Sequence, residues 1–181
     1  DAKFVLDPTL LLDKYEYLKL IEDYQALLPE NKGIYTYLLD TRDWKDQVLN
    51  QISDSLGANI FNSQPKATVE KPSDNPDDYI IPSVECWLKG FNDAEFVVTD
   101  SFHGTVFAIL FNKPFVSLLN ADRGGARLLS LLCEFGLEDR LVAGYDECKI
   151  NNLIYQYIDY PEINKKLKKL KKTSEDFLMI N

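Results

Sequence analysis

The side chains best suited to chemistry lie in one short stretch of the sequence, Thr99-Asp-Ser-Phe-His-Gly104. His103 is the only histidine of the 181 residues, and the flanking residues predict a buried strand that leads into a buried helix. The first turn of a helix offers unpaired N–H groups and a partial positive charge, which favour phosphate or carboxylate ligands. We therefore expect His103 to bind an anion or to serve as a general acid or base.

The neighbours of His103 allow more than one interpretation. Asp100 or Ser101 can cap the helix, and Gly104, which lacks a Cβ atom, would let an anion approach the first-turn backbone. A Ser–His–Asp hydrolase site is excluded, because residues this close cannot form the linear triad and no GxSxG pattern is present. A polar cap on a buried helix, without any chemistry, stays open as an alternative.

The sequence on both sides of this stretch alternates between segments typical of strands and segments typical of helices. These elements are expected to position residues 99–104. Short β-branched and aromatic segments predict strands, and apolar residues three and four apart predict helices. Thr41 is expected to cap the second helix, and Pro82 to lie in the first turn of the third. The predicted strands span residues 34–39, 59–61, 96–99, 115–118 and 140–143. The predicted helices span residues 14–27, 42–56, 82–92, 102–111 and 127–135, with another from about residue 161.

Strands that alternate with helices indicate an α/β fold, a Rossmann-like parallel sheet with helices on both faces. Strand 96–99 is apolar on both sides, as is typical of a central parallel strand. Helix 102–111 is apolar all round, so its second face must contact the C-terminal helix or a domain outside this chain. We expect an inter-domain segment and helix over residues 1–30, the α/β domain over 31–145, and C-terminal helices over 146–181 that pack on it.

Two segments have biased compositions. Residues 62–81 are rich in Pro, Asp, Ser and Asn, which suits a mobile lid over residues 63–81 and plain disorder equally well. The C-terminal segment concentrates basic charge and favours a docked helix with a solvated lysine face; attraction to an anionic polymer or membrane surface is the alternative. Its lysines are Lys165, Lys166, Lys168, Lys169, Lys171 and Lys172.

Composition limits the classes of function. The chain has 29 acidic and 20 basic residues, a net charge of −9, which argues against general nucleic-acid binding. No window of 18 apolar residues predicts a transmembrane segment, and the first residues show no signal-peptide pattern. Cys86, Cys133 and Cys148 fit neither a disulfide framework nor a zinc site, which indicates a reducing cytoplasm. The sequence shows no metal-ligand cluster, so we expect no metal.

The residues around His103 also resemble a known family. Asp100-Ser-Phe-His-Gly104, followed by TVFAILFNKPF, is similar to the signature of the polysaccharide pyruvyl transferases. Other parts of that family are resembled, in the expected order, by Leu6–Leu12, Ile34–Asp40, Pro82–Leu88 and the LLSLLCEFGLEDRL segment after Arg127. The resemblance covers about residues 5–143.

The resemblance implies one half of a two-domain enzyme. Members of this family are similar to GT-B glycosyltransferases, in which two Rossmann-like domains enclose a cleft. The chain matches the C-terminal half, so an N-terminal domain is an expected partner. The implied reaction transfers a pyruvyl unit from phosphoenolpyruvate to a hexose of a cell-surface polysaccharide or lipid-linked sugar, giving a pyruvate ketal without a cofactor. The implied location is cytoplasmic, including the inner face of the membrane.

The same resemblance implies roles for the residues of the signature. His103 would bind the donor and act as a general acid or base. Backbone N–H groups of Ser101, Phe102 and Gly104 would hold an anionic group of the donor.

Arginines outside the signature would complete the site. Arg127 would supply a fork for carboxylate or phosphate, with Arg123 as its substitute and Arg42, just beyond the first strand, as a weaker candidate. A surface salt bridge is the alternative for Arg127 and Arg123. Two other functions stay open for the whole chain: a GT-B enzyme with a nucleotide-sugar donor, and a non-catalytic binding domain.

Overall fold

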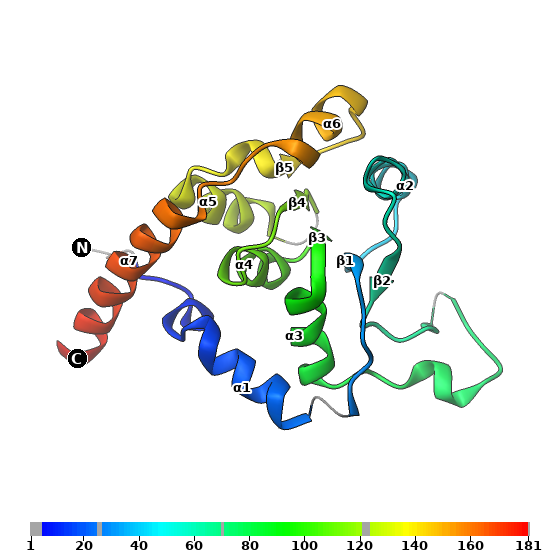
Figure 1. Ribbon diagram of the computed structural model, residues 1–181, viewed down its shortest axis with the longest axis horizontal. Helices are drawn as coiled ribbons and strands as arrows, with labels where there is room; N and C mark the ends of the chain where they lie inside the picture. The colour runs from blue at the N-terminus through cyan, green and yellow to red at the C-terminus, as the bar shows by residue number, and fades with distance from the viewer. Residues whose placement is uncertain (1–4, 25–26, 70, 121–123, 181) are drawn as a thin grey trace.

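A five-stranded parallel sheet lies at the centre of the computed structural model, which describes residues 5–24, 27–69, 71–120 and 124–180 (Figure 1). The strands follow the order β2-β1-β3-β4-β5, and every neighbouring pair is parallel. The predicted α/β fold with a parallel sheet is therefore confirmed. The strands are β1 (Gly33–Tyr37), β2 (Ile60–Asn62), β3 (Ala94–Thr99), β4 (Phe115–Leu118) and β5 (Leu141–Val142).

Helices connect the strands close to the predicted positions, but the residues expected to begin the second and third of the predicted helices differ from the observed ones. The N-cap of α2 is Arg42 rather than Thr41, and it makes no side-chain cap bond. Ser83 caps α3 by accepting a hydrogen bond from Cys86 N at 3.2 Å, so Pro82 lies before the helix. The helices are η1 (Pro8–Leu11), α1 (Lys14–Tyr24), α2 (Asp43–Leu56), η3 (Pro76–Tyr79), α3 (Val84–Asp93), α4 (Phe102–Leu110), α5 (Gly125–Phe135), η4 (Glu138–Arg140), α6 (Glu147–Tyr155) and α7 (Tyr160–Ile180).

The sheet separates two apolar clusters. Side chains of α3, α4 and α5 form one cluster, and side chains of α2 and α6 form the other. Strand β3 serves both, because Val97 belongs to the first cluster and Phe96 and Val98 to the second. This arrangement buries β3 completely on both faces from Phe96 onward, as its apolar sequence predicts.

Helix α4 is buried from Gly104 to Leu110. One side contacts β3 and β4, and the other contacts η1 and α5. Tyr17 of α1 also meets Phe107 of α4 edge-on, with ring centroids 4.9 Å apart. The N-terminal segment and α5 therefore cover this face, and Ile163 and Leu167 of the C-terminal helix belong to the same apolar cluster (Figure 1). Cover by another domain stays a prediction.

Helix α7 docks on the N-terminal segment. Ile163 and Leu167 are buried, which confirms the predicted apolar stripe. The hydroxyl of Ser174 accepts a hydrogen bond from Leu6 N at 3.0 Å, and Lys171 Nζ donates to the carbonyl oxygen of Leu12 at 2.8 Å. The docked helix with an exposed lysine face is thus confirmed, except that Lys171 turns inward.

The described part of the loop over residues 63–81 has local structure. Ala67 is buried, and its N–H donates to the carbonyl oxygen of Asp78 at 2.9 Å, which folds the loop back on itself. Asn75 starts η3 by accepting a hydrogen bond from Asp77 N at 3.2 Å. Plain disorder is therefore not what this segment shows, and its role as a lid stays a prediction.

Candidate functional site

The strand order creates a crevice between the carboxyl ends of β1 and β3. The chain leaves β1 toward β2 and leaves β3 toward β4, so the two connections diverge on opposite faces of the sheet. Such a switch point is where open parallel sheets bind ligands. Ser101 and His103, directly after β3, line a cleft of about 680 Å³ there, together with Tyr37 at the end of β1 and Trp87 of α3.

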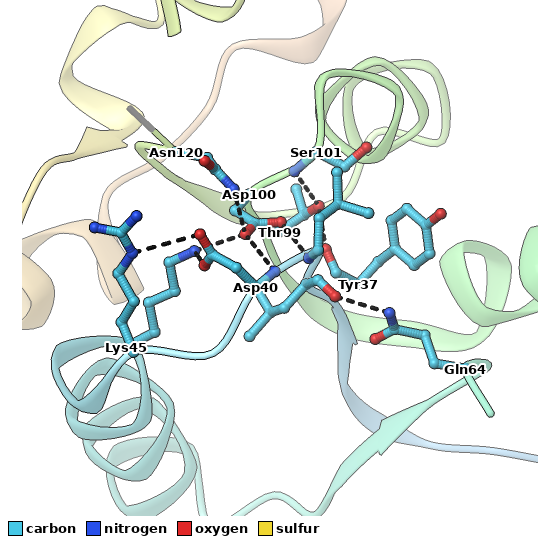
Figure 2. A network of polar contacts seen from close by, with 11 residues as sticks. Tyr37, Asp40, Lys45, Gln64, Thr99, Asp100, Ser101 and Asn120 are labelled. Carbon is cyan, nitrogen blue, oxygen red and sulfur yellow. Dashed lines mark hydrogen bonds and ion pairs between the residues drawn. The ribbon is translucent and has the colours of Figure 1, made fainter. Parts of the chain in front are cut away.

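Asp100, the residue before Ser101, holds the two strand ends together (Figure 2). Its carboxylate accepts hydrogen bonds from Leu39 N at 2.7 Å and Asp40 N at 3.3 Å, and from Asn120 Nδ2 at 3.3 Å. Lys45 Nζ donates to the same carboxylate at 2.6 Å. Asp100 is therefore fully buried and bonded to the loop after β1, to α2 and to the loop after β4, and it is not the helix cap.

Lys45 is the cation of this network. Its side chain is completely buried between the carboxylates of Asp100 and Asp40. Partial burial acts to raise the pKa of Asp40, but the hydrogen bond and charge of Lys45 and the charge of Arg42 outweigh it, so the pKa lies below its usual range. The Asp40 carboxylate is thus held in its ionised form beside Lys45.

Ser101 and Gly104 fix the start of α4. Ser101 Oγ accepts a hydrogen bond from Gly104 N at 3.3 Å, which makes Ser101 the predicted helix cap. A Cβ atom on Gly104 would lie 2.1 Å from Thr99 Oγ1. The glycine is therefore required by the close approach of α4 to β3, and not by an anion, because its Cα faces the Thr99 side chain. Its proposed backbone contact with an anion stays untested.

His103 lies in the first turn of α4 with its side chain 50% exposed. The imidazole borders the cleft, and its Nε2 is 3.9 Å from Asp7 Oδ1. Its ring meets the Phe102 ring edge-on, with centroids 5.4 Å apart. These contacts fix the direction of the imidazole while leaving half of it open to a ligand.

Arg127, near the start of α5, lies on the other side of Phe102. The guanidinium carbon is 3.7 Å from the centre of the Phe102 ring, and Nη2 donates to Asp7 Oδ2 at 2.7 Å. The alternative of a simple surface salt bridge does not describe it fully, because ring stacking and a hydrogen bond orient the same guanidinium. Arg127 remains 58% exposed, so much of its donor fork faces solvent.

Asp7 joins His103 to Arg127. Partial burial acts to raise the pKa of Asp7. The hydrogen bonds from Thr9, the charge of His103 and the hydrogen bond from Arg127 together outweigh burial, so the pKa lies below its usual value. No sequence pattern singled out Asp7 as a site residue, although it lies in the Leu6–Leu12 segment that resembles the family. An aspartate before proline also predicts a helix cap, which is the role its bond to Thr9 N at 3.0 Å provides.

The remaining arginine candidates are not brought to His103 in the same way. Arg42 pairs with Asp40, with 3.4 Å between Nε and Oδ2, and so belongs to the Lys45 network. Arg123 lies outside the described residues. Lys45 was not anticipated as a site-forming residue, since a lone lysine in an amphipathic helix usually faces solvent.

No group of three or more His, Cys, Asp and Glu side chains among the described residues is arranged to hold a metal ion. None of their helices is both long enough and apolar enough to cross a membrane.

Comparison with known proteins assigns the family. The sequence profile described as polysaccharide pyruvyl transferase matches residues 1–122 of the 181, about two thirds of the chain. The chain belongs to the polysaccharide pyruvyl transferase family. The resemblance found around His103 is thereby confirmed. No curated protein matches the chain.

Among solved structures, the chain is similar to spinosyn forosaminyltransferase. The sequences are 14% identical, the TM-score is 0.43, and the match covers 97% of this chain and 44% of that structure. The chain therefore spans less than half the length of that glycosyltransferase.

Proposed function

We propose that the chain is the donor-binding half of an enzyme that transfers a pyruvyl group from phosphoenolpyruvate to a sugar of a polysaccharide. One observation carries the proposal: a half-exposed histidine in the first turn of α4 borders the switch-point cleft and shares Asp7 with an oriented arginine. Membership of the pyruvyl transferase family supports the same assignment. A cytoplasmic setting, where phosphoenolpyruvate is made, and an N-terminal partner domain belong to this proposal.

The donor suits the charges of the site. Phosphoenolpyruvate carries a phosphate and a carboxylate, and a guanidinium fork binds either group with two parallel hydrogen bonds. Arg127 has exposed N–H groups for this purpose, and the first-turn N–H groups of α4 add a partial positive charge. We assign Arg127 and the backbone of Phe102 to donor binding.

The reaction needs a proton donor and a proton acceptor. A proton is added to the methylene carbon of phosphoenolpyruvate while a sugar hydroxyl attacks its central carbon, which gives a tetrahedral adduct. A second hydroxyl then replaces the phosphate and closes the ketal. The two hydroxyl protons balance the one taken up by carbon and the one that leaves with phosphate. His103 is positioned to transfer such protons, since its imidazole is accessible from the cleft.

Calorimetry on the full-length protein tests the proposal. We expect phosphoenolpyruvate to bind, and we expect Arg127→Gln to weaken that binding roughly tenfold or more, because a charged hydrogen-bonding partner is lost. A nucleotide diphosphate hexose is the second ligand. Binding of the nucleotide sugar alone would replace the proposal with glycosyl transfer, and no heat from either ligand would favour a non-catalytic binding domain.

A further inference from the structure

Helix α7 turns two polar side chains inward. Of its described polar side chains, those of Lys171 and Ser174 are buried, with 8% and 2% exposed, whereas the other five lysines of the helix face solvent. A polar group that leaves water is tolerated only where it makes hydrogen bonds. The partners of both side chains lie in the N-terminal segment, 159 and 168 positions away in the sequence.

These two side chains hold η1 at both of its ends. Ser174 Oγ accepts a hydrogen bond from Leu6 N, before η1, at 3.0 Å, and it donates its own proton to Leu170 O at 2.9 Å. Lys171 Nζ donates to Leu12 O, after η1, at 2.8 Å. Because the Ser174 hydroxyl both donates and accepts, its direction is fixed by α7 itself.

Asp7 lies between the two contacts. It follows Leu6 directly, and its carboxylate accepts a hydrogen bond from Thr9 N at 3.0 Å, which fixes the side chain relative to the backbone of η1. The place of the carboxylate therefore depends on where η1 lies. Arg127 Nη2 donates to this carboxylate at 2.7 Å, and His103 Nε2 lies 3.9 Å from it. A displacement of η1 would thus move the partner that the two site residues share.

Apolar packing alone does not fix the place of η1. Leu6 and Leu10 are buried in the same cluster as Ile163 and Leu167 of α7, but apolar contacts have no preferred direction. The hydrogen bond to Ser174 depends on both length and angle, so it allows little movement. Packing therefore holds η1 against α7, and the hydrogen bond selects its exact position there.

We infer that Ser174 is a positioning residue for the donor site, acting on Arg127 and His103 through Leu6 and Asp7. The inference rests on the proposed function, because phosphoenolpyruvate is the ligand whose binding this placement favours. A shift of about 1 Å in a group far from the reacting atoms can lower activity roughly 100-fold. A smaller effect is expected here, since the packing of η1 on α7 remains when the hydrogen bond is lost.

Calorimetry on the full-length protein tests the inference. Ser174→Ala removes the acceptor for Leu6 N and should weaken phosphoenolpyruvate binding about 2- to 5-fold, at a temperature at which thermal unfolding shows the variant to be folded. Thr173→Ala is the matched control. The Thr173 hydroxyl also donates to the carbonyl oxygen four residues earlier, at 3.1 Å, but its side chain is exposed, so its removal should leave binding unchanged.

A double variant separates positioning from a general structural defect. In Asp7→Asn, Arg127 has already lost its charged partner, so adding Ser174→Ala should weaken binding no further if Ser174 acts through Asp7. Independent effects that multiply, an unchanged affinity in Ser174→Ala, or an equal loss in Thr173→Ala would overturn the inference. If Ser174→Ala does not fold, Lys171→Met, which releases the other end of η1, takes its place with the same expected outcomes.

A second measurement needs no ligand. The side-chain NMR signal of His103, identified by its loss in His103→Gln, senses the nearby Asp7 carboxylate. Ser174→Ala should shift this signal and Thr173→Ala should not, and an unshifted signal in Ser174→Ala would overturn the inference. A shifted signal in a protein that does not bind phosphoenolpyruvate would instead overturn the proposed function and leave the positioning role of Ser174 in place.

Discussion

Asp100 and His103 lie three residues apart and have opposite environments. The Asp100 side chain is completely buried and receives hydrogen bonds from two backbone N–H groups, Lys45 and Asn120. His103 is half exposed, and its Nε2 lies 3.9 Å from the Asp7 carboxylate. The Asp100 carboxylate therefore serves the fold, whereas half of the His103 side chain, in the first turn of α4, stays accessible.

The difference has a physical cause. A buried carboxylate is tolerated only when its oxygens are paired, and the partners of Asp100 leave no room for a substrate. A half-exposed side chain at the end of a helix does not pay this desolvation cost, so His103 does not need a full set of hydrogen-bond partners. A polar residue in a family signature can therefore report on folding as well as on chemistry.

The largest expected effect on stability comes from disrupting the buried ion pair of Asp100 and Lys45. Lys45→Met removes the buried cation and leaves the Asp100 carboxylate without its charged partner, so we expect a loss of about 3–5 kcal/mol in the free energy of unfolding. Urea denaturation measures it. Lys32→Met is the control, because the Lys32–Glu95 pair is exposed and should contribute less than about 1 kcal/mol. Similar losses in the two variants would contradict a structural role for Lys45.

Substitution of the half-exposed His103 should change the activity of the enzyme rather than its stability. His103→Gln is expected to slow ketal formation by the full-length enzyme about 100- to 10,000-fold, since a proton-transfer group is lost. Its free energy of unfolding should change by no more than about 0.5 kcal/mol, because the side chain is half exposed. Phosphate release and ketal formation at saturating donor measure the first effect, and thermal unfolding the second. A wild-type rate would remove His103 from the mechanism.

Asp7→Asn should have a smaller effect than Lys45→Met or His103→Gln. Asparagine still caps η1, but it loses the charge that holds Arg127, so we expect a severalfold higher KM for phosphoenolpyruvate with little change in the acceptor KM. Steady-state kinetics with each substrate varied in turn provide the measurement. Equal changes in both KM values would indicate a general structural defect.

The same variant predicts a pH dependence of stability. The folded pKa of Asp7 is lowered, so its ionised form stabilises the fold above the ordinary carboxyl range, and that contribution is lost as the pH falls through the folded pKa. The difference in melting temperature between the unaltered protein and Asp7→Asn should therefore be present at pH 7 and shrink toward pH 3. A difference that stays constant over this range would show that the Asp7 charge does not act.

Local sequence patterns were sufficient to predict the helices and strands and to recognise the signature at residues 100–104. They did not predict which distant side chains contact the signature residues. The apolar run at β3 and the aromatic run at β1 each identify a strand. No local pattern pairs Lys45 with Asp100, which is 55 residues away, or Arg127 with Asp7, which is 120 residues away. Those pairs depend on strand order, and parallel strands are joined through long connections that leave no trace in a short window.

Two residues of the signature show a further limit. A glycine at the start of a helix suits both anion binding and close packing, and only the position of Thr99 selects packing for Gly104. The sequence predicts only a backbone role for Phe102, yet the guanidinium of Arg127 stacks on its ring. Side-chain contacts between separate elements decide such cases, and a single sequence does not contain them.

The hydrogen bond between Leu6 N and Ser174 Oγ joins positions 168 residues apart. Leu6 immediately precedes Asp7, so the far end of the chain anchors the carboxylate on which both His103 and Arg127 depend. Synthesis must reach α7 before that anchor exists, so the contacts of Asp7 are completed only after α7 has been made.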